Sequence, residues 1–445
     1  MNFVNGEIIG ASECERVLER IDEMVTKTLE KPPLDINLVI NACDRLVKSL
    51  VGEGETAGAP PGNFALSEKL SKLGISPVLA DIYIKQISQT LNAAAIRARM
   101  EIELGSHYNS PRTLTYSHSG ATAVQTLAPL GVLFHITAGN VDGLPFISLL
   151  DGLLTGNINI VKLPSEEGGV TVSLLKELFK VEPSLREYVY VFDYSSKDIH
   201  AMKKLATIAD AVVIWGGDEA ISAVRKLATP NTKIIEWGHK VSFAYVTKEG
   251  LNNIKTLEKL ALHICLTNQL FCSACQGVFV DSDDMGDVYN FCEIFLPILE
   301  KACNDNPPNF DSSLALFIQA EITIQDYQRR LEGKEKATRI FRTENCSITA
   351  KSDSKLESSV MHRNIWVKPL KRDSLMSLRP YKNYLQTAAL ICSKREHPEL
   401  AQKLLKAGLV KISDGFDMSN YAFGEAHDGV FTLRQYTKLV SVQDF

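Results

Sequence analysis

The sequence predicts an α/β protein with parallel sheets. Between residues 131 and 237 short apolar runs alternate with helix-like stretches; the runs are GVLFHIT, INIVKL, YVYVFD, AVVIW and KIIEW. Strands that alternate with helices form a parallel sheet whose two faces the helices cover. A second alternation begins at residue 243, where FAYVT and GVFVD flank a helical stretch. At 445 residues the chain is also too long for one ordinary domain, so two or three domains are expected.

Helices are predicted before the first of these strands. From residue 11 to about residue 104, apolar side chains recur at helical spacing, except in the Gly/Pro-rich stretch 51–64, a predicted loop. Residues 113–129 alternate in polarity and are rich in Thr and small residues, which predicts an extended, hairpin-like segment. Residues 325–360 are charged and weakly patterned.

The composition excludes several classes of protein. A net charge of −5 and a pI near 6.0 give no electrostatic reason to bind nucleic acid or an anionic membrane. The most apolar stretch, 144–163, contains Asp151, Asn157 and Asn159, which does not fit a membrane span. The N-terminus lacks a signal-peptide pattern, and nine cysteines, an odd number, do not suggest a disulfide framework. A reducing cytoplasm is the expected location.

Four segments carry candidate chemistry. The first parallel strand is not followed by G-x-G-x-x-G, so a nucleotide would be bound without that fingerprint. No H-x-x-x-H and no cluster of Cys with His has the spacing of a metal site, and no metal is predicted. The four segments are PLGVLFHITAGNVDGLPF (129–146), LLTGNINIVKLPSEEG (153–168), IIEWGHKVSFAYV (234–246) and TNQLFCSACQGVFVD (267–281).

Together these segments resemble the aldehyde dehydrogenase superfamily, whose members carry an Asn-bearing turn, a G-N-x-x-x-x-K-x-x loop, E-L-G-G-K and a Gln-preceded catalytic cysteine. A closer resemblance is to the LuxC-type fatty-acyl-CoA reductases of bacterial luminescence operons. Those share P-x-G-V-x-x-H-I…G-N-V, N-Q-x-x-C-S-x-x-Q and H-D-G. Here the three motifs are Pro129 to Val141, Asn268 to Gln276 and His427 to Gly429, and the resemblance covers roughly residues 110–435.

The resemblance implies an aldehyde dehydrogenase-like fold. It has a parallel-sheet NAD(P)-binding domain at 1–238, an α/β catalytic domain at 239–415 and a closing segment at 416–445. By the same resemblance, 113–129 and the closing segment form an oligomerisation element in a homodimer or homotetramer, since an extended hairpin presents unpaired edges. The luminescence enzymes receive acyl groups from a synthetase subunit, which makes such a subunit a candidate partner.

Cys272 is the candidate nucleophile. A thiolate attacks a thioester or an aldehyde, forms a covalent adduct and later leaves well. A free cysteine is more often a small buried residue, and the order of the four segments is what favours catalysis. Cys275 forms a C-x-x-C with Cys272, a spacing found in redox pairs and in half of a zinc site. Because no second C-x-x-C exists, we interpret Cys275 as a bystander.

The resemblance assigns catalytic roles to two further residues. Asn140 matches the superfamily's oxyanion asparagine; alternatively it only stabilises a Gly-Asn turn. Glu236 matches the general base. In a reductase it would deprotonate Cys272 or protonate the departing oxygen, and the alternative is a strand-end glutamate in solvent.

Cofactor contacts are expected by resemblance on three turns, at Thr137–Ala138, at Lys162 with Ser165, and at Gly216–Gly217. A glutamate in place of Ser165 would repel a 2′-phosphate, whereas Ser165 admits one and Lys162 would neutralise it. This favours NADPH, with NADH as the alternative because Glu166 adjoins. Gly216 and Gly217 open a helix whose N–H groups can receive a pyrophosphate, unless they form a plain tight turn.

The expected reaction is reduction of an acyl-CoA, with a fatty acyl chain, to the aldehyde by NAD(P)H, through an acyl-enzyme on Cys272 and with release of coenzyme A. One alternative is a hydrolytic aldehyde dehydrogenase that oxidises an aldehyde to the acid. Another is a non-catalytic subunit or thiol sensor on the same fold.

Overall fold

The computed structural model describes residues 1–51, 77–105, 108, 111–115, 118, 120–139, 143–165, 169–307, 312–333, 338–419 and 424–443. The chain forms two compact units. The first comprises Met1–Gly238 and Ala422–Phe445, and the second comprises His239–Tyr421. In the chain, both ends of the second unit therefore connect to the first.

The first unit contains a seven-stranded sheet in the order β2-β1-β7-β6-β5-β8-β9. The five strands β7, β6, β5, β8 and β9 are parallel to one another. Strands β1 and β2 extend the β7 edge of the sheet in antiparallel pairs. The five parallel strands are the five apolar runs between residues 131 and 237, which confirms the predicted parallel sheet. The bounds are β1 Asn2–Val4, β2 Glu7–Ile9, β5 Val132–Ile136, β6 Ile158–Lys162, β7 Val189–Phe192, β8 Ala211–Trp215 and β9 Lys233–Trp237.

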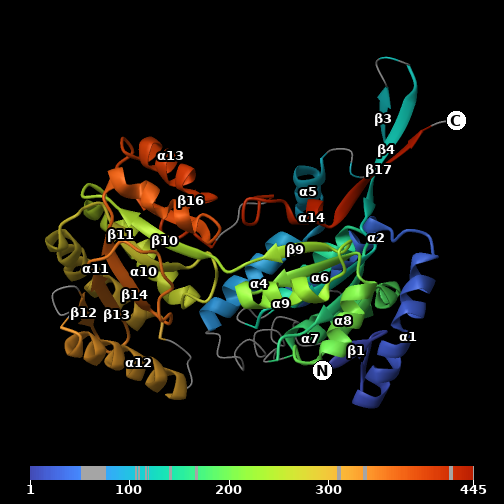
Figure 1. The fold of residues 1–445 in the computed structure, drawn as a ribbon, viewed down its shortest axis with the longest axis horizontal. Helices are drawn as coiled ribbons and strands as arrows, with labels where there is room; N and C mark the ends of the chain where they lie inside the picture. Colours follow the sequence, from blue (N-terminus) through green and yellow to red (C-terminus); the bar gives the residue numbers. More distant parts are fainter. Residues whose placement is uncertain are drawn as a thin grey trace. The chain divides into compact units, whose positions relative to one another are not determined.

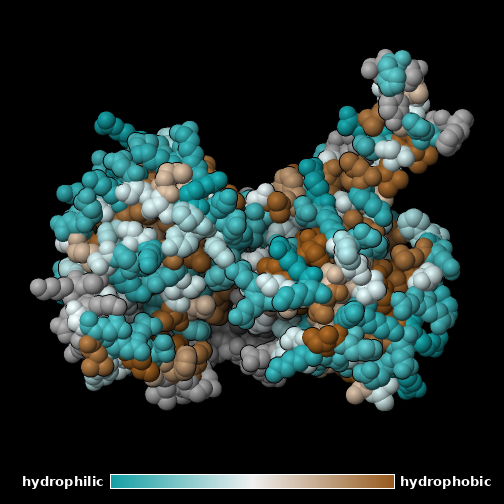
Figure 2. All heavy atoms as spheres, in the orientation of Figure 1, coloured by the Kyte–Doolittle hydropathy of each residue, from teal (hydrophilic) through white to brown (hydrophobic). Residues whose placement is uncertain are grey.

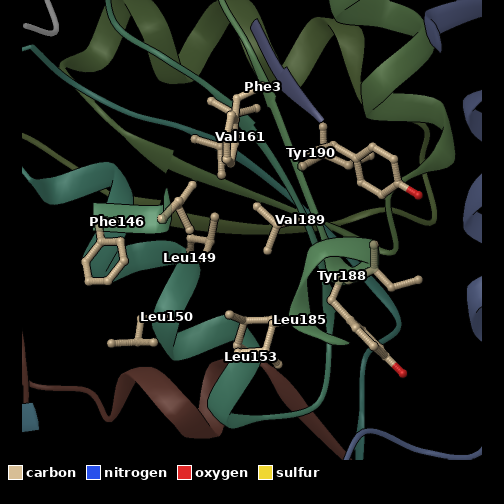
Figure 3. Packing of buried hydrophobic residues seen from close by; sticks show 14 of the residues in the cluster. Phe3, Phe146, Leu149, Leu150, Leu153, Val161, Leu185, Tyr188, Val189 and Tyr190 are labelled. Atoms are coloured by element: carbon tan, nitrogen blue, oxygen red, sulfur yellow. The ribbon is translucent and has the colours of Figure 1, made fainter. Parts of the chain in front are cut away.

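Helices bury their apolar faces against this sheet. Helix α6 (Leu144–Leu154) is buried along almost its whole length. Figure 3 shows Leu149 and Leu153 of α6 in one cluster with Val161 and Val189 of the sheet. The other helices of the unit are α1 Ala11–Leu29, α2 Ile36–Val51, α4 Pro77–Leu91, α5 Ala93–Leu104, α7 Val170–Val181, η1 Pro183–Tyr188, α8 Ile199–Ile208, α9 Asp218–Leu227 and α14 Thr432–Gln435.

Asp151 and Asn157, which interrupt the apolar stretch 144–163, have hydrogen-bond partners within the first unit. Asp151 of α6 accepts two hydrogen bonds from Arg99, at 2.7 and 3.0 Å, and Arg99 also donates to Glu103 at 2.6 Å. Glu103 in turn accepts from the backbone N–H of Leu433 in α14, at 2.8 Å. Asn157 donates to the carbonyl of Tyr436 at 3.0 Å. These contacts hold the residues after 421, which we call the C-terminal return, in the first unit.

A three-stranded antiparallel sheet, β17-β4-β3, forms an arm on the first unit (Figure 1). Its strands are β3 Arg112–Thr115, β4 Thr122–Pro129 and β17 Thr437–Gln443. The extended segment predicted at 113–129 is confirmed in its described residues. Hydrophobic side chains are visible on the arm in Figure 2, and Leu439 and Val442 are 64% and 57% exposed.

The second unit contains a seven-stranded sheet in the order β12-β13-β14-β11-β10-β15-β16, parallel except for the β12–β13 pair. Strands β12 and β13 lie in the weakly patterned region 325–360. The strands are β10 Val241–Val246, β11 Cys275–Val280, β12 Thr338–Arg342, β13 Ser347–Lys351, β14 Asn364–Pro369, β15 Leu385–Ile391 and β16 Lys411–Ser413. The helices are η2 Gly250–Asn252, α10 Ile254–Thr267, α11 Met285–Asp305, α12 Ser312–Leu331, η3 Arg372–Tyr381 and α13 His397–Ala407.

Across both units, none of the described helices is at once long enough and apolar enough to cross a membrane.

The centre of this second sheet should tolerate no side chain at Gly277. Gly277 lies opposite Trp366 of β14, and a Cβ atom added to it would stand 2.0 Å from the indole ring. The ring is buried and donates to the carbonyl of Glu357, so it has little freedom to move. Gly277→Ala should therefore lower the free energy of unfolding by about 1–3 kcal/mol, as overpacking does. Thermal unfolding measures this. Gly238→Ala, whose new Cβ would meet its nearest neighbour at 3.6 Å, is the control and should unfold like the wild type. Equal melting temperatures for all three proteins would contradict the packing argument.

Candidate active site

Cys272 lies on the loop between α10 and β11, which we call the cysteine loop (residues 268–274). The loop begins where Asn268 and Gln269 take left-handed backbone conformations, with φ of 47° and 62°, and so end the helix. Ala274 N–H bonds back to the carbonyl of Phe271 at 2.9 Å. The side chain of Cys272 is partly exposed, as a nucleophile must be.

Two buried glutamines hold the cysteine loop in place. The amide of Gln269 donates to the carbonyls of Cys275 and Asn364, at 3.1 and 3.2 Å. The amide of Gln276 donates to the carbonyl of Gln269 at 2.9 Å, and its oxygen accepts from the N–H and hydroxyl of Ser359. These bonds explain why the motif N-Q-x-x-C-S-x-x-Q has glutamine on both sides of the cysteine.

A second segment with left-handed backbone conformations, residues 361–363, bonds to Asn268 at the start of the cysteine loop. Seven non-glycine residues of the described chain have φ between +47° and +71°; besides Asn268 and Gln269 they include the consecutive Met361, His362 and Arg363. The N–H of His362 donates to the Asn268 carbonyl at 3.0 Å, and Arg363 Nε donates to Asn268 Oδ1 at 3.1 Å. Backbone strain of this kind persists only where surrounding contacts enforce it, and it gathers at functional sites. No pattern in the sequence pointed to this segment.

Two side chains, one from β10 and one from β15, donate hydrogen bonds to Cys272. Ser242 of β10 donates to the Cys272 carbonyl at 2.7 Å. Gln386 of β15, only 1% exposed, donates from Nε2 to the Cys272 sulfur at 3.3 Å. Neither residue was predicted from the sequence: Gln386 lies outside the four segments of candidate chemistry, and Ser242 lies in the segment 234–246 but had no assigned role.

Glu236, the predicted general base, lies on β9 in the first unit. Its two carboxylate oxygens accept hydrogen bonds from Arg225 Nε and Nη2, at 2.5 and 2.7 Å. The carboxylate raises the pKa of Arg225 through these hydrogen bonds. A general base must have an oxygen available for a proton, so this ion pair would have to open first. The role of Glu236 remains a prediction.

The predicted cofactor residues lie at the carboxyl ends of parallel strands, the edge at which such sheets bind ligands. Lys162 ends β6, is 6% exposed and forms no ion pair with another described residue; burial lowers its pKa. Thr137 follows β5 and donates to the Lys162 carbonyl at 3.3 Å. Ala138 follows it and is partly exposed, whereas Ser165 is exposed. Gly216 and Gly217 connect β8 to α9, whose N-terminus no side chain caps. Asn140 and Glu166 lie outside the described residues.

The comparisons with known proteins agree with this architecture. A profile of the acyl-CoA reductase (LuxC) family matches residues 63–439. The chain belongs to the LuxC family. It is 24% identical over 323 residues to a long-chain acyl-protein thioester reductase of Aliivibrio fischeri, a match that covers 70% of this chain and 64% of the relative. The chain thus spans less than two thirds of the length of that relative.

The fold of this LuxC-family chain is that of the aldehyde dehydrogenases. Lactaldehyde dehydrogenase of Escherichia coli superimposes with a TM-score of 0.66 and 14% identity, covering 100% of this chain and 95% of the other. Indole-3-acetaldehyde dehydrogenase of P. syringae, solved in complex with NAD⁺, superimposes with a TM-score of 0.70 and 14% identity, covering 100% and 96%. The aldehyde dehydrogenase-like fold expected from the sequence is confirmed.

The H-D-G motif of the LuxC family now has a structural explanation. Asp428 and Gly429 have φ of +50° and +81° and form a two-residue turn that pairs His427 with Val430. The turn sets the His427 ring 5.5 and 5.1 Å from the rings of Trp215 and Trp237, which stack on each other at the ends of β8 and β9. The motif therefore packs the C-terminal return against the carboxyl edge of the first sheet.

Cys272 should be the most reactive of the nine thiols. Seven are buried, and the other partly exposed thiol, Cys392, has its pKa raised to about 11 by burial and by Glu396. Cys275 is fully buried, donates to the Gly277 carbonyl at 3.2 Å and has its pKa raised to about 12 by burial. Because the thiolate is the reactive form, brief treatment with iodoacetamide at neutral pH should add one label, at Cys272. Peptide mass spectrometry locates it. A first label on Cys275 would overturn this assignment.

Proposed function

We propose that this LuxC-family protein reduces an acyl thioester to the aldehyde, with Cys272 as the nucleophile. The observation that carries the proposal is the partly exposed residue Cys272 on a loop held by buried amides, while its neighbour Cys275 is buried as a thiol. A fixed, accessible thiol beside a protected one suits covalent catalysis by a single residue.

In the proposed mechanism the Cys272 thiolate attacks the thioester carbonyl and displaces the donor thiol, leaving an acyl group on the sulfur. The oxyanion that forms needs hydrogen-bond donors; Asn140 and the Cys272 backbone N–H are proposed for this role. When bound, a nicotinamide coenzyme supplies hydride to the acyl carbon. Glu236 would serve as proton donor or acceptor if its pair with Arg225 opens. Cys272 then leaves as the thiohemiacetal collapses to the aldehyde.

The acyl donor is proposed to be a fatty acyl thioester, either acyl-CoA with coenzyme A as product or an acyl-protein. The second form is the one in the name of the Aliivibrio fischeri relative. An acyl-transferring synthetase subunit would then be the partner. We further propose, as expected from the sequence, that the first unit binds the cofactor, that the second carries the catalysis, and that the arm β17-β4-β3 pairs subunits into a dimer or tetramer. The exposed Leu439 and Val442 on its edge strand favour such pairing.

NADPH is the proposed cofactor, with NADH as the alternative. The residues fit a dinucleotide: Lys162 is a buried cation without an ion pair to another described residue, and Gly216–Gly217 place an uncapped helix N-terminus at the same sheet edge. Lys162 would pair with a 2′-phosphate beside Ser165.

Hydrolytic oxidation of an aldehyde is the second candidate. That reaction needs a carboxylate free to activate water, and both Glu236 oxygens are bonded to Arg225. Because opening of this pair would free Glu236 for either reaction, the product, aldehyde or acid, separates the two candidates. A non-catalytic subunit or thiol sensor is the third candidate, and it would bind coenzyme without turnover.

Replacement of the nucleophile tests the reaction. Cys272→Ser should abolish reduction of acyl-CoAs from acetyl to palmitoyl, because a serine hydroxyl beside the same groups is a far weaker nucleophile. Coenzyme absorbance follows turnover, and intact mass shows the acyl adduct. Cys275→Ser is the matched control and should keep most of the activity and the adduct. The proposal fails if the acyl group is found on Cys275, or if the wild type releases acid instead of aldehyde.

Cofactor choice is tested at Ser165. Ser165→Glu should raise the KM for NADPH sharply and spare NADH, because a carboxylate beside the 2′-phosphate is repulsive. Lys162→Ala should weaken both cofactors, NADPH more. Ser222→Glu, on an exposed position of α9, adds the same charge elsewhere and should change neither KM. If the wild type strongly prefers NADH and Glu166→Ser relaxes that preference, Glu166 and not Ser165 is the residue that controls cofactor choice.

A further inference from the structure

We propose that Gln386 is a catalytic residue of this LuxC-family protein, whose side-chain amide donates to the Cys272 sulfur and holds it as a thiolate. The inference rests on Cys272 being the nucleophile of the proposed function. Gln386 Nε2 lies 3.3 Å from the sulfur, and the side chain is only 1% exposed.

The pairing of β10 with both of its neighbouring strands is irregular at Ser242. Along β10 and β15, Val241 pairs with Leu385 but Phe243 pairs with Ala388, so β15 has one extra residue opposite Ser242. Along β10 and β11, Ser242 pairs with Cys275 but Ala244 pairs with Val278, which again leaves one extra residue on the neighbour. Such β-bulges redirect side chains and are frequent next to active sites. Here the bulge on β15 contains Gln386 and Thr387.

The hydroxyl of Ser242 joins this bulge to the cysteine loop. It accepts from the Thr387 backbone N–H at 3.1 Å and donates to the Cys272 carbonyl at 2.7 Å. Ser242 and Thr387 are both fully buried. The loop, the bulge and the Gln386 amide are therefore held in one hydrogen-bonded arrangement, which fixes the distance between Nε2 and the sulfur.

The cost of burying an amide supports a role in chemistry. A buried amide is unfavourable unless its hydrogen bonds are made, and an apolar side chain of equal size would fill the same place without that cost. The bond to sulfur is weak while Cys272 is a thiol and becomes a stronger, charge-assisted bond when the proton leaves to solvent. Gln386 thus favours the thiolate over the thiol. It is neutral at every relevant pH and exchanges no proton with the substrate.

Activation of Cys272 by Gln386 would not depend on Glu236. The Glu236 carboxylate belongs to the first unit and is bonded to Arg225, whereas Gln386 lies in the same unit as Cys272. When the acyl group is on the sulfur the bond weakens, and it strengthens again as Cys272 leaves the thiohemiacetal. The same amide therefore assists both the attack and the departure of Cys272.

The test is the pH dependence of Cys272 alkylation by iodoacetamide, read by peptide mass spectrometry. It requires neither coenzyme nor acyl donor, so its result is separate from the success or failure of the proposed reductase activity. Gln386→Met keeps the volume and removes the donor, and it should raise the midpoint of the rate profile by about one pH unit. Gln386→Glu places a carboxylate beside the sulfur and should raise the midpoint further.

Gln402→Glu provides the matched charge control, since Gln402 is an exposed residue of α13 in the same unit; its midpoint should equal that of the wild type. Thermal unfolding checks that each variant is folded. Should Gln386→Met unfold, Gln386→Leu takes its place, because it also removes the donor and adds no charge. Folded Gln386 variants with the midpoint of the wild type would overturn the proposal.

Discussion

The cysteine loop depends on hydrogen bonds from side-chain amides to its backbone. Two successive left-handed residues, Asn268 and Gln269, end α10 and turn the chain away from it, so the following backbone groups lose the partners that a helix would give them. Gln269 of the loop and Gln276 of β11 supply hydrogen bonds in their place, and Ser359 connects both glutamines to a segment far along the chain. This arrangement separates the two cysteines: Cys272 stands at the surface of the loop, and Cys275 begins a buried strand.

The sequence predicted the fold well where hydrophobic patterning was strong. Five buried parallel strands give near-continuous apolar runs, and all five were found. Strands at sheet edges were missed. Arg339 and Arg342 make β12 look like a charged loop, yet β12 is an edge strand that buries only Phe341 and needs no apolar run. Asp151 and Asn157 interrupt the apolar stretch 144–163, but their hydrogen-bond partners could not be inferred from the sequence.

The candidate site could be predicted only as far as short motifs extend. Cys272 stands in one, and its two flanking glutamines belong to the same motif. Gln386 and Arg363 lie outside these motifs, and nothing in the segment 234–246 marks Ser242. Gln386 precedes an apolar run that indicates only a strand, and its contact with Cys272 results from a bulge. A bulge is set by the register of two strands distant in sequence, and periodicity within one strand does not reveal it.

Polar contacts hold the C-terminal return in the first unit. Residues after 421 belong to the first unit, where buried contacts from Glu103 to Leu433 and from Asn157 to Tyr436 hold them. Each contact satisfies a polar group that would otherwise be buried unpaired, so detaching the return would cost the desolvation of these groups. His427 is thereby fixed against the tryptophans at the carboxyl edge of the first sheet. The chain leaves the first unit after β9, a strand of its sheet, and these contacts hold the residues that return to it.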